Sequence, residues 1–146
     1  MNVRGFLADL QQQPTYRDQI AAHHVLPAAA ATTAPLDPPL PEPLAAALAR
    51  QGITSYYTHQ VAAVEAARAG RDVVVVTGTA SGKTLCYNLP VLEAVLTDRR
   101  ARALYLFPLK ALAQDQLRKL GDLDLWRAVR CATYDGDTPE SERRTV

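Results

Sequence analysis

The residues best suited to chemistry lie at positions 72–84, where a valine-rich run leads through small residues into Gly82-Lys83-Thr84. A strand that turns directly into a helix presents free backbone N–H groups and the positive end of the helix at one point, which favours a polyphosphate. Gly82 lets the backbone approach such a ligand, Lys83 supplies a cation for the β and γ phosphates, and the Thr84 hydroxyl is a ligand for Mg²⁺. The pattern predicts a phosphate-binding loop.

The loop departs from the strict phosphate-loop pattern at its first position, where Thr77 replaces glycine. Gly78 is the residue that can supply the missing flexibility instead. An ordinary turn with a surface lysine is the alternative, and the strand before the loop and the helix after it favour phosphate binding.

The elements around the loop alternate between β-branched or aromatic runs and leucine-rich helical patterns, which is typical of a parallel sheet covered by helices. The expected fold class is therefore α/β. We predict strands at 72–77, 102–107 and 129–134, and helices at 44–50, 58–69, 83–96 and 110–120. Residues at helical spacing should face the core: Leu85, Leu89, Leu92 and Leu96 in one helix, and Leu109, Leu112 or Ala113, Leu117 and Leu120 in another.

Length and composition indicate one globular domain: 146 residues, 48% hydrophobic and 21% charged, with a net charge of +1. No apolar run is long enough for a membrane span, and no signal peptide is recognisable at the N-terminus, so we expect a cytoplasmic protein without membrane contact. The near-neutral charge leaves nucleic-acid binding undecided. Residues 1–43, with prolines at 27, 35, 38, 39, 41 and 43, are expected to form an extended arm, and residues 44–146 the folded domain.

Four segments in this order and spacing resemble the superfamily 2 DEAD/DEAH-box helicases: residues 52–60 resemble the Q motif, 77–84 motif I, 107–116 motif Ia, and 134–139 a later strand-groove segment. The resemblance implies a RecA-like P-loop NTPase fold that uses ATP and Mg²⁺, with Gln60 reading adenine and Lys83 as the catalytic residue. It implies cofactor contacts from Tyr57, Gln60, Thr79, Ala80, Ser81, Gly82, Lys83 and Thr84, with Thr84 on the metal, and nucleic-acid contacts from Pro108, Lys110, Ala111, Gly136 and Asp137.

The combination of residues 16–20, 59–60, 79–84 and 134–138 is similar to the mitomycin repair factor A branch of these helicases. That similarity implies a role in DNA repair, with single-stranded or forked DNA as partner, and a C-terminal zinc-binding domain that this sequence lacks. The acidic Mg²⁺ motif and a second RecA-like domain are also not found in it. We therefore expect an incomplete sheet with unpaired edges and no unwinding by this chain alone.

Two other functions remain open from the residues themselves: a small P-loop phosphotransferase with a metabolite acceptor, and a nucleotide-binding module without catalysis. Tyr57 is equally suited to core packing and to stacking on adenine. His59 is expected to make local hydrogen bonds or packing contacts, because phosphoryl transfer needs no histidine base. Residues 135–137 also suit a simple turn.

Overall fold

The computed structural model describes residues 2–27, 30–125 and 128–144. The chain divides into two compact units, Met1–Ala30 and Ala31–Val146. The first unit contains helix α1 (Val3–Gln11), which begins where the Asn2 side chain accepts a hydrogen bond from the Gly5 N–H at 3.1 Å. Capping of this kind satisfies one of the N–H groups that have no partner inside the helix.

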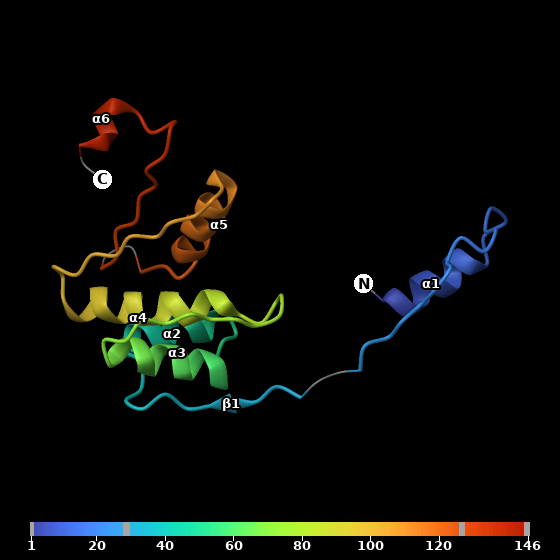
Figure 1. Ribbon diagram of the computed structural model, residues 1–146, viewed down its shortest axis with the longest axis horizontal. Helices are drawn as coiled ribbons and strands as arrows, with labels where there is room; N and C mark the ends of the chain where they lie inside the picture. The colour runs from blue at the N-terminus through green and yellow to red at the C-terminus, as the bar shows by residue number, and fades with distance from the viewer. Residues whose placement is uncertain (1, 28–29, 126–127, 145–146) are drawn as a thin grey trace. The chain divides into compact units, whose positions relative to one another are not determined.

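The second unit is built mainly from helices, and Figure 1 shows α2, α3 and α4 side by side. Its elements are β1 (Thr33–Ala34), α2 (Glu42–Arg50), β2 (Tyr56–Tyr57), α3 (Thr58–Arg68), α4 (Lys83–Thr97), α5 (Lys110–Gly121) and α6 (Glu140–Arg143). The four helices predicted from periodicity are confirmed within two residues at each end. None of the helices in the described residues combines the length and apolarity needed to cross a bilayer.

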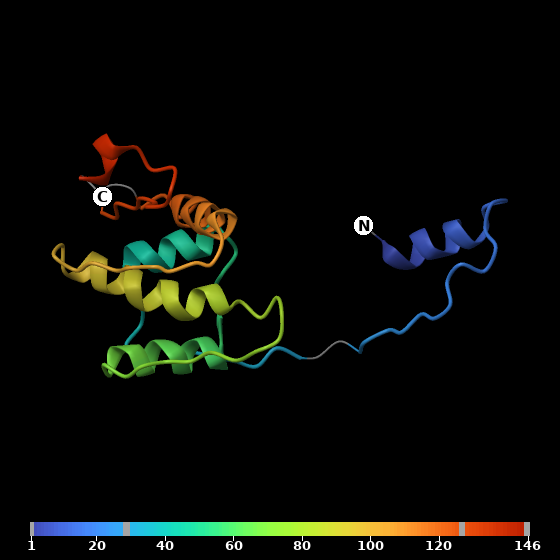
Figure 2. The same cartoon turned by 45° about the horizontal axis from the view of Figure 1, so that its top comes forward.

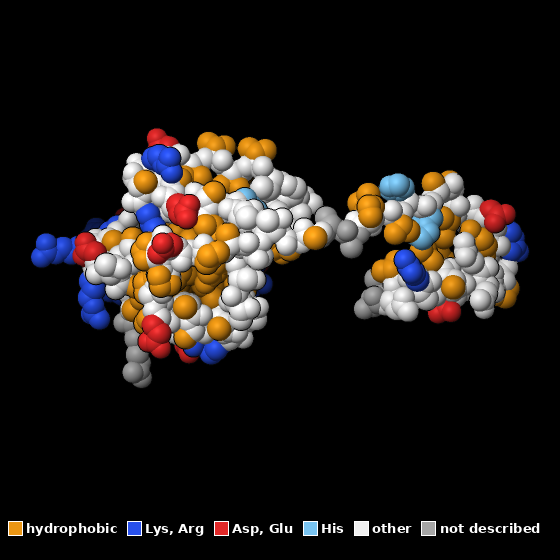
Figure 3. All heavy atoms as spheres, turned by 90° about the horizontal axis from the view of Figure 1, so that it is seen from below, with side chains coloured by type: hydrophobic (Ala, Val, Ile, Leu, Met, Phe, Trp, Pro, Cys, Tyr) orange, Lys and Arg blue, Asp and Glu red, His pale blue; other side chains and the backbone are white. Residues whose placement is uncertain are grey.

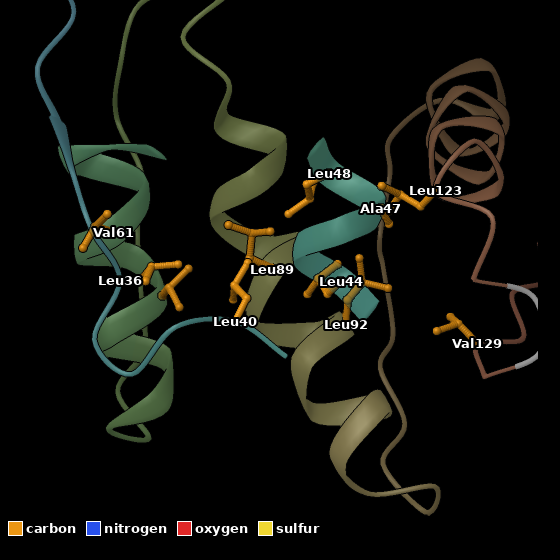
Figure 4. Packing of buried hydrophobic residues seen from close by; sticks show 11 residues of the cluster. Leu36, Leu40, Leu44, Ala47, Leu48, Val61, Leu89, Leu92, Leu123 and Val129 are labelled. Carbon is orange, nitrogen blue, oxygen red and sulfur yellow. The ribbon is translucent and has the colours of Figure 1, made fainter. Parts of the chain in front are cut away.

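The core of the second unit is formed by apolar residues of α2, α3 and α4, together with Leu36 and Leu40 before α2 and Leu123 and Val129 after α5. Leu44, Leu89 and Val64 are completely buried, one from each helix. Figure 4 shows Leu89 of α4 close to Leu44 and Leu48 of α2. Helices α3 and α4 also pack against each other, and the phosphate-loop residues lie between these two helices in sequence.

Arg68 at the end of α3 ties α4 and the segment before α2 together. Its guanidinium donates two hydrogen bonds to the Glu93 carboxylate, at 2.9 and 2.8 Å, and a third to the Pro38 carbonyl at 2.7 Å. The hydrogen bond to Glu93 raises the pKa of Arg68. The pair is largely shielded from water, and its two hydrogen bonds make it bidentate.

We expect Arg68→Ala to lower the free energy of unfolding by about 1–2 kcal/mol, because it removes three hydrogen bonds and leaves the Glu93 carboxylate without its partner. Urea denaturation of the variant measures this loss. Arg71→Ala, which removes an exposed arginine three residues later, is the control and should change the midpoint little. An equal loss in both variants would show that the Arg68 contacts contribute nothing specific.

The predicted parallel sheet is not formed, and this corrects the expected strand assignments. Among the described residues, none at 72–77, 102–107 or 129–134 lies in a strand, and the paired strands are β1 and β2, which run antiparallel with Thr33 opposite Tyr57. Figures 1 and 2 show segments 72–77 and 102–107 following different sides of α4. Without a neighbour about 4.8 Å away, neither segment can make ladder hydrogen bonds.

The unpaired segments nevertheless keep the alternating exposure of strands. Val75 and Tyr105 are half-buried, whereas Val74 and Val76 are both 88% exposed and Leu104 is 85% exposed. Hydrophobic side chains are visible on the surface of this unit in Figure 3. One face of each segment is therefore partly buried. The opposite face is open to solvent, although the sequence predicts a sheet that helices cover on both faces.

Two further expectations differ from the structure. Residues 31–43 belong to the second unit rather than to an arm ending at residue 43, because Leu36 and Leu40 are part of the core and Thr33 pairs with Tyr57. On α5 the buried face is centred on Gln116; Leu109 is 62% exposed and Leu112 44% exposed, whereas Ala113, the alternative to Leu112, is half-buried. Gln116 faces inward because its side-chain carbonyl accepts a hydrogen bond from the Tyr87 hydroxyl of α4 at 3.1 Å.

Candidate functional site

The phosphate-loop residues join segment 72–77 to α4, whose first residue is Lys83. Gly82 caps this helix with a φ of +74°, and Ala80 has a φ of +57°. Gly78 does not have a left-handed backbone. The left-handed residues of the loop are Ala80 and Gly82, so they, rather than Gly78, hold the unusual backbone conformation. The loop therefore turns into α4 through two left-handed residues, Ala80 and Gly82, with Ser81 between them.

Ala80 holds a conformation that costs an L-amino acid roughly 1 kcal/mol and costs glycine nothing sterically. We expect Ala80→Gly to raise the free energy of unfolding by up to about 1 kcal/mol, because relief of this strain exceeds the added entropy of the unfolded chain. Thermal unfolding monitored by circular dichroism measures the change. Ala113→Gly, a substitution within α5, should lower stability, as glycine does in a helix. A loss of stability in Ala80→Gly would contradict the interpretation.

The Lys83 ammonium group is held by oxygen atoms of its own loop. It donates to the Thr77 carbonyl at 2.9 Å and to the Gly78 carbonyl, and the Thr77 and Ser81 hydroxyls are each 3.3 Å away. The two hydroxyls are hydrogen-bonded to each other at 2.6 Å. The cation therefore lies over the loop on neutral oxygens, and phosphate oxygens that reach this position would replace them with charge-assisted partners.

Gln60 connects the start of α3 with the loop. Its side-chain carbonyl accepts from the Tyr57 N–H at 2.9 Å, which caps α3, and its amide donates to the Gly82 carbonyl at 2.9 Å. The side chain is only 2% exposed. A Cβ atom on Gly82 would lie 2.5 Å from the Gln60 amide nitrogen, so this contact requires glycine at position 82.

His59 makes a second contact between α3 and the loop. Its Nε2 lies 2.9 Å from the Ser81 carbonyl oxygen, and its ring is stacked on Tyr57 at 5.6 Å between ring centres. The packing contact with Tyr57 is local, as the sequence predicts, whereas the hydrogen bond is not local, because its partner is 22 residues away in the chain. Thr79 is exposed and Thr84 half-buried in the same loop.

The residues proposed for nucleic-acid contact form a second group, at the start of α5 and in the segment before α6. Lys110 forms an ion pair with Asp137 and lies 3.9 Å from Asp135. The hydrogen bond to Asp137 raises the pKa of Lys110. Gly136 lies beside the Lys110 ammonium, and Pro108 and Ala111 are exposed nearby in the chain. A surface hollow of about 330 Å³ is lined by Lys110, Gln114, Thr133, Asp135, Asp137, Thr138, Pro139 and Glu142.

The structure thus brings the two expected nucleic-acid segments together, and it places Tyr57 and Gln60 against the phosphate loop. Two contacts were not foreseen: the bond from His59 to the loop and the pairing of Lys110 with the acidic residues. The sequence contains a signal for the His59 contact, because His59 lies next to Gln60 on the first turn of α3. No local pattern signals the second, since its partners are about 25 residues apart.

Known proteins resemble this chain over most of its length. The DEAD/DEAH box helicase family matches residues 57–146. The chain is 44% identical over 131 residues to the uncharacterized ATP-dependent helicase YprA of Bacillus subtilis (strain 168), covering 88% of this chain and 18% of that protein. It is 35% identical over 152 residues to the ATP-dependent helicase hrq1 of Schizosaccharomyces pombe, covering 99% of this chain and 14% of that protein.

A similar fold is found in crystal structures of the DUF1998 helicase MrfA. The structure bound to DNA and AMPPNP is 40% identical, with a TM-score of 0.80, and the match covers 97% of this chain and 20% of that one. A structure of MrfA bound to DNA is 47% identical, with a TM-score of 0.74, over 79% of this chain and 16% of that one. The chain therefore spans no more than a fifth of the length of these relatives.

Proposed function

This chain belongs to the DEAD/DEAH box helicase family, and on that premise we propose that it forms the ATP-binding part and a portion of the strand-binding groove of an ATP-dependent DNA helicase. Its fold class, RecA-like α/β, is that of the matched family and of MrfA. The helicase activity, the DNA partner and the use of ATP are proposals for this chain, because it spans a small part of its relatives.

One observation carries the proposal: the Q-motif glutamine and the motif I lysine meet at the same loop. Gln60 donates to the Gly82 carbonyl, and Lys83 follows at the first position of α4. ATP fits this arrangement, because Gly82 leaves its backbone uncovered by a side chain and Lys83 provides a cation at the helix start. AMPPNP in the similar MrfA structure supports this assignment.

Within this proposal, Lys83 holds the β and γ phosphates, and Ser81, Ala80 and Thr79 contribute backbone contacts. Thr84 is the residue that would hold Mg²⁺, together with phosphate oxygens; its hydroxyl suits a cation that binds mainly through its nucleotide. Mg²⁺ supplies charge neutralisation during phosphoryl transfer. Tyr57 is 39% exposed beside Gly82, which suits stacking of the base on its ring.

The strand-binding portion is proposed at Pro108, Lys110, Ala111, Gly136 and Asp137. A phosphate that approaches Lys110 competes with Asp137 for the same ammonium group. We propose single-stranded or forked DNA as the partner and a role in DNA repair; the DNA bound in MrfA supports a DNA partner.

We expect Lys110→Ala to weaken binding of single-stranded DNA uniformly across sequences and to lower the salt slope of the binding constant by about 1, because one phosphate contact is lost. Fluorescence anisotropy with a labelled oligonucleotide at several salt concentrations measures both. Lys119→Ala is the matched control: nine residues along α5, it points about 180° away from Lys110. An unchanged slope in Lys110→Ala would remove this residue from the DNA interface.

A small P-loop phosphotransferase is the second function that the loop permits, and competition experiments separate the two. Bound fluorescent ATP should respond to single-stranded DNA if the chain is the helicase portion, and to a small phosphate acceptor if it is a kinase. ATP binding that responds to neither would indicate a nucleotide-binding module without catalysis.

A further inference from the structure

Two consecutive carbonyl groups of the phosphate loop are bound by two consecutive side chains of α3. His59 Nε2 lies 2.9 Å from the Ser81 oxygen, and Gln60 Nε2 lies 2.9 Å from the Gly82 oxygen. Because a carbonyl oxygen can only accept, His59 must donate its Nε2 hydrogen in this contact. Both loop carbonyls are thereby directed toward α3.

The direction of a carbonyl fixes the direction of the N–H group in the same peptide. In a trans peptide the C=O and N–H bonds point in opposite directions, and the cis bond of the described residues is elsewhere, at Asp37-Pro38. With the Ser81 carbonyl directed at His59, the Gly82 N–H points away from α3. The Gly82 carbonyl accepts from Gln60 and, at 3.1 Å, from the Leu85 N–H of α4, and these two bonds together fix the direction of the Lys83 N–H.

These two N–H groups are at the start of α4, where helix geometry leaves them without partners inside the helix. The rotation of the peptide between Ser81 and Gly82 is otherwise weakly restrained, because Gly82 has no Cβ and adopts both signs of φ readily. A hydrogen bond to the Ser81 carbonyl therefore restricts the rotation of this peptide, which glycine at position 82 leaves free. The ring of His59 is in turn held by its stack on Tyr57.

We propose that His59 is a positioning residue for phosphate capture: its Nε2–H bond to the Ser81 carbonyl aims the Gly82 N–H at the bound phosphates. The inference rests on the proposed ATP site. It gives His59 a role that is separate from adenine reading by Gln60, because His59 acts on the phosphate end of the nucleotide.

Two variants with an amide side chain test whether the position of the hydrogen-bond donor matters or only the presence of a polar group. The side-chain amide nitrogen that His59→Gln introduces can reach the position of histidine Nε2, whereas the shorter amide of His59→Asn cannot. We expect His59→Asn to weaken ATP·Mg binding about fivefold, the value of one hydrogen bond, and His59→Gln to stay within about twofold of the unaltered chain. Adenosine, which has no phosphates, should bind all three proteins equally. Calorimetric titration of the full chain measures each affinity.

Three results would overturn the inference: His59→Asn binding ATP as tightly as the unaltered chain, equal losses in both variants, or an equal loss for adenosine and ATP. Should His59→Asn fail to fold by circular dichroism, His59→Phe replaces it, since it keeps a ring against Tyr57 and lacks the donor. If the unaltered chain binds no ATP and Lys83→Met behaves the same, the proposed function fails and the inference with it. ATP binding that is insensitive to His59 overturns the inference alone.

Discussion

Gly82→Ala is expected to lower the free energy of unfolding by about 2 kcal/mol or more and to weaken ATP binding at least about tenfold. Two causes act together. The φ of +74° at Gly82 is unfavourable for any residue with a Cβ, and that Cβ would lie 2.5 Å from the Gln60 amide nitrogen. Gln60 is buried and bound at both ends of its amide, so it cannot move aside without losing its bond to the start of α3.

Gly78→Ala is the matched control for this prediction. A Cβ at Gly78 meets no atom within 4 Å, and its backbone is not left-handed. Urea denaturation and ATP titration of both variants should therefore show a large effect at position 82 and little at position 78. Equal effects at the two positions would mean that the contact between Gln60 and Gly82 does not shape the loop.

Lys83→Met is expected to reduce ATP affinity about 100-fold, because one ammonium group makes charge-assisted hydrogen bonds to two phosphates and methionine makes none. Methionine keeps a similar length of apolar side chain, so the loss should come from charge and hydrogen bonding. The free energy of unfolding should change by less than about 1 kcal/mol, since the partners of Lys83 in the structure are half-exposed loop oxygens that water can satisfy.

Lys119→Met provides the comparison for charge alone. Lys119 lies on α5 and pairs with Asp115 at 2.7 Å, and this exposed pair is remote in sequence from the loop. Calorimetry should give unchanged ATP affinity for this variant. An ATP affinity of Lys83→Met within about threefold of the unaltered chain would show that Lys83 does not contact the phosphates.

Local sequence patterns predict the helices of this chain well and the sheet poorly. Helix α4 is recognisable from leucines at positions 85, 89, 92 and 96, and it extends past Pro90 to Thr97. Such spacing depends only on the residues of one helix, so it can be recognised from the local sequence. Strand pairing depends on a neighbour elsewhere in the chain, and the resemblance places the strand with the acidic motif beside the loop strand. Among the described residues, segments 72–77 and 102–107 keep the alternation of strands but have no paired neighbour.

The candidate site shows the same division. Gly82, Lys83 and Thr84 are recognisable because they are consecutive residues of a known phosphate-binding motif. The roles of Ala80 and of His59 depend on backbone angles and on a contact across 22 residues, which no local pattern encodes. Gln60 caps α3 through the Tyr57 N–H, and its bond to Gly82 is a further contact across 22 residues.

Whether this loop binds a triphosphate is tested most directly by titrating the ¹⁵N-labelled chain with ATP and Mg²⁺. The backbone amide resonances are recorded at each step. We expect the largest shifts at Gly82, Lys83 and Thr84, with smaller ones at Tyr57 and Gln60, and their loss in Lys83→Met. Shifts that centre on another part of the chain, or loop amides that stay unmoved at saturating ATP, would contradict phosphate binding at residues 79–84.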